Sequence, residues 1–180
     1  MKKKISQIVA YLALGIVAIA VLLCAIIKID FKPGVNVPTY ASSGVQIRKT
    51  EGDYTSFRGV ESEENYNEII KKYNDSFKLT VLYSLFSGKI GSETKITHVT
   101  SKTNAIGYEV KFNFAEEQIL NNNDDTIEYS KIFFSVEKDK GLEEKTIWLY
   151  SGENDYYKIT TIANFDSLAN YISELDMFAE

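Results

Sequence analysis

Four aromatic residues late in the chain are the side chains best suited to binding. Trp148, Tyr150, Tyr156 and Tyr157 lie within one stretch of ten residues. Rings on an exposed sheet face can stack on sugars or anchor a protein partner. Aromatic residues in strands also commonly pack in the core or against cross-strand neighbours. We therefore take these four residues as the candidate contacts for a ligand or a partner.

The sequence contains few residues that could act as a nucleophile or bind a transition metal. His98 is the single histidine and Cys24 the single cysteine, and Cys24 lies in an apolar stretch. This excludes a catalytic Cys–His pair and argues against transition-metal sites with nitrogen or sulfur ligands. Catalysis by His98 would need a partner that the sequence does not identify, so we interpret it as a surface or half-buried strand residue. We expect no catalytic residue, no cofactor and no metal ion.

The acidic residues offer two further kinds of site. Residues 121–125 read Asn-Asn-Asn-Asp-Asp and concentrate the oxygen ligands that Ca²⁺ prefers. As an EF-hand loop the segment fails, because Thr126 occupies the sixth position and Ile132 the twelfth. A solvated turn is the favoured interpretation. Glu143 and Glu144 suggest a glycosidase pair, but adjacent strand residues point to opposite faces.

The N-terminal region contains the longest apolar stretch. Residues 8–27 include no charged residue and no proline, and they lie between Lys4 and Lys28. At about 1.5 Å per residue, such a helix covers the roughly 30 Å hydrocarbon core of a bilayer. The sequence therefore predicts a transmembrane anchor, with residues 5–27 in contact with lipid.

Two alternatives for this N-terminus are disfavoured. A cleaved secretory signal has an apolar region of about 7–15 residues followed by a small-residue cleavage site. Here the only close match, Ala18-Ile19-Ala20, lies inside the apolar stretch. A lipid-modified Cys24 would require a small residue before it, whereas Leu23 is bulky. An uncleaved anchor remains the favoured interpretation.

The distribution of charge predicts the orientation. Three lysines precede the apolar stretch, and Lys28 and Lys32 follow it, which favours a cytoplasmic N-terminus. Of the 20 basic and 25 acidic residues, five and one precede Pro33, so the rest carries 15 and 24 and a net charge of −9. An anionic inner leaflet would repel that region, and it lacks the basic character of nucleic-acid-binding proteins. We expect an extracytoplasmic domain at the cell membrane and no nucleic-acid partner.

The remaining chain divides into a linker and one domain. We expect residues 1–31 to form the cytoplasmic N-terminus and anchor, 32–61 a linker, and 62–180 an extracytoplasmic domain. Glycine and proline interrupt any periodicity in the linker, although 45–47 could add a short edge strand. A long helix is predicted from Ser62, a plausible N-cap, to Gly88. Five strands are expected at 95–101, 107–114, 126–137, 145–150 and 156–163, followed by a short helix from Asp166.

This order of elements predicts an α+β fold. Short connections between successive strands indicate a five-stranded antiparallel meander, with the long helix packed on one face. The arrangement resembles that of cystatin-like and nuclear-transport-factor-like domains, in which a curved sheet holds a helix. Folds of this kind serve enzymes, binding proteins and assembly subunits alike, so the resemblance does not imply a function.

The leading functional hypothesis is a single-pass membrane protein. It would display one non-catalytic domain for protein interaction or envelope assembly. The second hypothesis is a membrane-tethered small-molecule or glycan-binding domain, with a pocket lined by Tyr108, Phe112 and Tyr129. The third and weakest is a hydrolase that uses carboxylates alone.

The predicted topology can be tested by labelling with a thiol reagent that does not cross the membrane. Cysteines introduced singly after Pro33 in a Cys24→Ser background should react in intact cells, because the chain beyond the anchor is expected outside. Sites before the anchor should react only after lysis. Protection of every site after Pro33 would reverse the topology.

Overall fold

The computed structural model describes residues 2–30, 42–51, 54–81, 95–103, 107–122, 125–175 and 177–178. The chain divides into two compact units. The first contains residues 1–31 and 78–92, and the second contains 32–77 and 93–180. The fold combines helices with an antiparallel sheet, which confirms the predicted α+β class.

The first unit consists of one helix and a small sheet. Helix α1 (Lys2–Ile26) includes an 18-residue window, Val9–Ile26, with a mean hydropathy of 2.8, so it is long and apolar enough to span a membrane. Strand β1 (Lys28–Asp30) follows it at once and pairs with β4 (Lys78–Thr80) in antiparallel register. The Val81 amide donates a further hydrogen bond to the Ile27 carbonyl at 3.0 Å. The chain that follows the second helix therefore returns to the end of α1.

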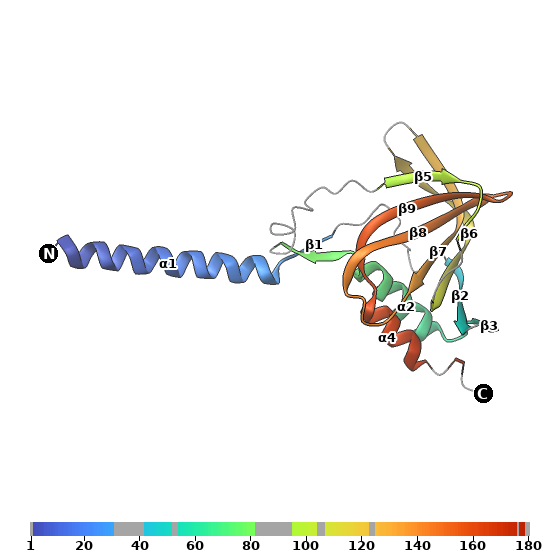
Figure 1. The fold of residues 1–180 in the computed structure, drawn as a ribbon, viewed down its shortest axis with the longest axis horizontal. Coiled ribbons are helices and arrows are strands. Elements are labelled where there is room, and N and C mark those ends of the chain that lie inside the picture. The colour runs from blue at the N-terminus through green and yellow to red at the C-terminus, as the bar shows by residue number, and fades with distance from the viewer. Residues whose placement is uncertain are drawn as a thin grey trace. The chain divides into compact units, whose positions relative to one another are not determined.

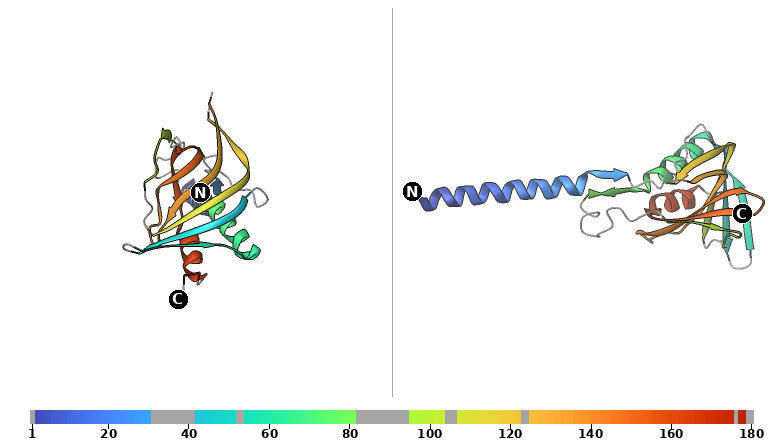
Figure 2. Two further views of the ribbon diagram at one scale, coloured as in Figure 1. Left: turned by 90° about the vertical axis from the view of Figure 1, so that its right-hand side faces the viewer. Right: turned by 90° about the horizontal axis from the view of Figure 1, so that it is seen from above.

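The second unit contains a sheet of seven antiparallel strands rather than the five expected (Figure 1). Their order is β3-β2-β6-β7-β8-β9-β5. The strands are β2 (Ser42–Glu51), β3 (Tyr54–Gly59), β5 (Lys95–Val99), β6 (Tyr108–Asn122), β7 (Asp125–Val136), β8 (Leu142–Gly152) and β9 (Asp155–Asn164). The five expected strands are present as β5 to β9, but the expected five-stranded meander is wrong, because β5 pairs with β9 instead of β6. Only β6 to β9 form a meander of long, bent strands (Figure 2).

The two additional strands lie within the range 32–61 that was expected to be a linker. Val45 and Ile47 are 2% and 0% exposed, and they alternate with the polar residues Gln46 and Arg48. This alternation allows β2 to bury one face against the core while pairing with β6. The apolar alternation is too short to predict a strand of ten residues, which is held mainly by its two neighbours.

The long helix predicted from Ser62 to Gly88 is wrong in length. Helix α2 (Glu63–Asp75) begins as expected, with the Ser62 hydroxyl accepting from the Asn65 amide at 3.4 Å. It ends at Asp75, with Ser76 as the C-cap, and residues 78–80 form β4 instead. Pairing with β1 satisfies the backbone groups of these residues, and the sequence gives no local sign of it because the partners lie about fifty residues apart. Residues 82–88 lie outside the described residues.

The core of the second unit lies between one face of the sheet and the two helices, α2 and α4 (Asp166–Glu174). The Tyr73 ring of α2 is 0% exposed and lies 5.2 Å from the Phe112 ring and 4.7 Å from the Phe134 ring. Phe165, just before α4, lies 5.1 Å from Phe134. One row of this face runs across six strands through Ile47, Val110, Phe134, Ile147, Ile159 and Ile96. We call this the helix-side face.

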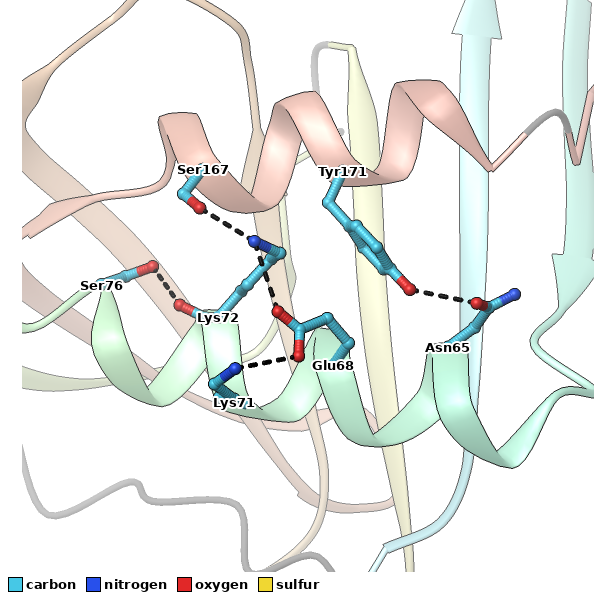
Figure 3. A network of polar contacts seen from close by, with 7 residues as sticks. All are labelled: Asn65, Glu68, Lys71, Lys72, Ser76, Ser167 and Tyr171. Atoms are coloured by element: carbon cyan, nitrogen blue, oxygen red, sulfur yellow. Dashed lines mark hydrogen bonds and ion pairs between the residues drawn. The ribbon is translucent and has the colours of Figure 1, made fainter.

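Polar contacts join α2 to α4 along the outer side of the helix pair (Figure 3). The Tyr171 hydroxyl lies 3.0 Å from the Asn65 side-chain oxygen, and the Lys72 ammonium lies 3.2 Å from the Ser167 hydroxyl. Lys72 also pairs with Glu68 at 3.4 Å and lies over the Tyr171 ring at 5.3 Å. Burial, and then the nearby acidic residues, raises the pKa of Tyr171. These contacts set how the two helices pack together.

Truncation of the core should show how strongly the sheet depends on the helix pair. Phe134→Ala is expected to lower the free energy of unfolding by about 3–5 kcal/mol, because it leaves a cavity beside Tyr73. Phe57→Ala is the matched control, since Phe57 is 59% exposed, and it should cost less than about 1 kcal/mol. Denaturant unfolding of the full-length protein in detergent, followed by Trp148 fluorescence, measures both. Equal losses of unfolding free energy in the two variants would contradict the assignment of Phe134 to the core.

Candidate binding face of the sheet

The register of the central strands places a second set of side chains on the opposite face. Lys111 lies across from Phe133, Phe133 across from Trp148, and Trp148 across from Lys158. Cross-strand partners share a face, and each of these residues is adjacent in sequence to one on the helix-side face. This second face carries lysines and aromatic rings in place of aliphatic residues.

The next row of the same face brings a lysine and two tyrosines together. Lys131 lies across from Tyr150, and Tyr150 across from Tyr156. The Lys131 ammonium lies 4.5 Å from the centre of the Tyr150 ring, and the two tyrosine rings lie 5.3 Å apart. Lys111, Lys131, Tyr150 and Tyr156 are all partly exposed, and we call these four residues the lysine–tyrosine patch.

Three of the four aromatic residues singled out in the sequence share this second face. Trp148, Tyr150 and Tyr156 lie there, and Trp148 is only 9% exposed. Tyr157 lies on the helix-side face, because it is adjacent to Tyr156 in the same strand. Its ring packs against His98 with 5.2 Å between ring centres. The four residues therefore do not form one surface, and Tyr150 with Tyr156 is the more accessible pair.

Lys102, which follows β5 in the chain, lies against part of the second face. β5 pairs with β9 at one edge, whereas β6 lies beyond β9, β8 and β7. Lys102 forms an ion pair with Glu109 and lies 5.1 Å from the Phe133 ring centre. Glu109 also pairs with Arg48 at 2.9 Å and is only 6% exposed. Glu109 is therefore the shared counter-ion of Arg48 and Lys102.

The lysine–tyrosine patch is electropositive. Burial, and then the like charge of Lys131, lowers the pKa of Lys111, while Glu109 opposes the shift. Within the part of the chain that the structure describes, neither lysine forms an ion pair. Among the described residues, this region of the sheet thus brings together Arg48, Lys102, Lys111, Lys131 and Lys158 with the buried carboxylate of Glu109, in a chain whose residues from Pro33 onward have a net charge of −9.

Other candidate sites offer less. His98 is 55% exposed and contacts the Asp155 side chain beside an open groove of about 480 Å³ at the β8–β9 turn. Among the described residues, no group of three or more His, Cys, Asp or Glu side chains is placed to hold a metal ion. Residues 123 and 124 of the acidic turn lie outside the described residues.

The residues expected to line an apolar pocket are largely packed in the core. Phe112 is 0% exposed and Tyr129 is 3% exposed. Burial raises the pKa of Tyr129 to about 12. Tyr108 is half-buried and lies against Phe178, with 6.0 Å between ring centres. Phe112 and Tyr129 are thus part of the packed core of the described residues.

Sequence reasoning did not identify the lysines of the patch. The alternation in residues 107–114 placed Lys111 on the polar side of its strand, which is correct, but gave it no role. Lys131 lies in a strand that is apolar on both faces, so it showed no pattern. Their proximity follows from the pairing of β6 with β7, with Lys111 opposite Phe133 and Asn113 opposite Lys131.

Removal of the Glu109 charge should destabilise this face. Glu109→Gln leaves Arg48 and Lys102 without their counter-ion, and a loss of about 3 kcal/mol in unfolding free energy is expected for this largely buried pairing. Glu143→Gln is the control, because Glu143 is 46% exposed and its pairing with Lys145 is screened by solvent. Thermal unfolding should give a clearly lower melting temperature for Glu109→Gln than for Glu143→Gln. A Glu109→Gln protein as stable as the wild type would show that the cluster is not structurally important.

No family model, curated protein or solved structure matches this chain. The case for a function therefore has to come from the geometry of the sheet and its charges.

Proposed function

We propose that this protein is a single-pass membrane protein that displays a non-catalytic α+β domain for protein interaction outside the cytoplasmic membrane. The observation that carries the proposal is the lysine–tyrosine patch. It lies on the sheet face that the helices leave uncovered, and it combines partly exposed rings with cations that have no ion-pair partner among the described residues.

The residue types of the patch favour binding over catalysis. Tyrosine supplies a large, rigid contact area at a low cost in conformational entropy, and it is enriched at protein interfaces. Tyr150 and Tyr156 already hold each other in place, with 5.3 Å between their rings. A partner would therefore meet a surface that needs little reordering, which favours affinity.

The anchor supports a location at the membrane. Helix α1 has the length and apolar character of a spanning segment. The excess of lysines before it favours a cytoplasmic N-terminus. A domain held at a membrane meets membrane or envelope partners at a high effective concentration, so a modest docking surface is sufficient there. An envelope-assembly role fits the same arrangement.

Glycan binding is the second candidate. Sugar rings can stack on tyrosine, and the Tyr150–Tyr156 pair offers a suitable surface. Lys111 and Lys131 favour a protein partner over a glycan, because a neutral glycan gains little binding free energy from these two cations. The packed core gives no support to a small apolar ligand held between sheet and helices.

Site-specific photo-cross-linking tests the proposed interaction. Tyr150 is replaced by a benzophenone-bearing phenylalanine in the full-length protein in its native membrane. A discrete protein adduct is expected, because the ring at this position would lie in the interface. The control places the same residue at Ile119, which is 60% exposed and lies in the distal part of the β6–β7 pair. No adduct at Tyr150, or the same adducts at both positions, would contradict the proposal.

A further inference from the structure

We infer that the Lys111–Lys131 pair receives a carboxylate side chain from the protein partner, next to an apolar residue that covers Tyr150. The inference rests on the proposed function and specifies the chemistry of the partner. It predicts that the partner presents a short segment in which Asp or Glu adjoins an aromatic or aliphatic residue.

The first support is geometry. Lys111 and Lys131 lie on adjacent strands and on the same face, one residue pair apart in register, because Lys111 faces Phe133 and Asn113 faces Lys131. Diagonal neighbours of this kind are about 7–8 Å apart at their Cα atoms, within reach of one shared carboxylate. The Asn113 amide lies 3.5 Å from the Gly44 carbonyl oxygen and so has its own contact. The lysines are thus the cationic donors that this part of the face presents.

The second support is the charge balance. The one buried carboxylate of this face, Glu109, already contacts Arg48 and Lys102. Lys111 and Lys131 repel each other, and the pKa of Lys111 is lowered by burial and by this repulsion. A carboxylate placed between the two ammonium groups would relieve the repulsion. The group that would complement Lys111 and Lys131 is therefore negatively charged.

The surrounding charge favours a short acidic segment over a long anionic polymer. The chain from Pro33 onward has a net charge of −9, so the electropositive patch belongs to a predominantly acidic domain. A polyanion that extends beyond the patch would be repelled, whereas a single acidic side chain would be attracted at close range only. The Tyr150 ring beside Lys131 adds an apolar surface that a polyanion would not use.

The test uses the full-length protein in detergent micelles and the peptide Ser-Phe-Glu-Phe-Ser with blocked ends. Chemical shifts of the lysine side chains and the pKa of Lys111 are followed by NMR spectroscopy. Binding should raise the pKa of Lys111, because a bound carboxylate stabilises its charged form. The peptide with Gln in place of Glu should bind at least about threefold more weakly, as expected for lost exposed ion pairs.

Variants of the protein make the test specific. Lys111→Gln and Lys131→Gln should each weaken peptide binding about two- to fivefold. Lys71→Gln is the control, because Lys71 is 66% exposed on α2, pairs with Glu68 and lies away from the patch. It should bind the peptide as the wild type does. Melting temperatures confirm that all three variants are folded.

Three outcomes would overturn the inference. They are equal affinity for the Glu and Gln peptides, unchanged binding by the Lys111 and Lys131 variants, and tighter binding of inorganic polyphosphate than of the peptide. Failure of the proposed function is distinguishable, because it appears as loss of the cross-link at Tyr150. A cross-link that persists in the Lys111→Gln, Lys131→Gln double variant would leave the protein interaction standing and reject its acidic specificity.

Discussion

The packing of Tyr73 between α2 and the sheet is the interaction on which the domain depends. Its ring contacts Phe112 of β6 and Phe134 of β7, and Phe165 closes the same cluster from the start of α4. Because side chains alternate along a strand, this contact decides the orientation of the neighbouring residues of β6 and β7 as far as the register shift between Asn113 and Gln118. Once Phe112 and Phe134 face the helices, Lys111 and Phe133 must face away from them.

The uncovered face that results is stabilised by charge and by aromatic contacts. Glu109 pairs with both Arg48 and Lys102 and so reduces the repulsion between these two cations. Lys102 also lies over the Phe133 ring, and Arg48 lies over the Phe57 ring. Lys131 lies over Tyr150. Cation–π contacts of this kind stabilise a lysine without neutralising it. The positive charge therefore remains available to a partner.

The first unit contains a segment that follows α2 in the chain as well as the N-terminal apolar helix. A single flexible linker would connect the apolar helix to the domain once. Instead, the chain passes between the two units three times, because residues 78–92 belong to the same unit as the apolar helix. The β1–β4 pairs and the Val81–Ile27 hydrogen bond hold this returning segment to the end of α1.

The sequence by itself determined the features that depend on local patterns. The apolar residues of α1, the Ser62 cap and the alternation around Val110 each depend on residues that are close together in the sequence. These features could therefore be predicted from the sequence alone. The end of α2, the places of β2 and β3 and the neighbourhood of Lys111 and Lys131 depend on pairing between distant segments. Only the tertiary structure decided these, because strand partners are chosen by burial and hydrogen bonding across the whole sheet.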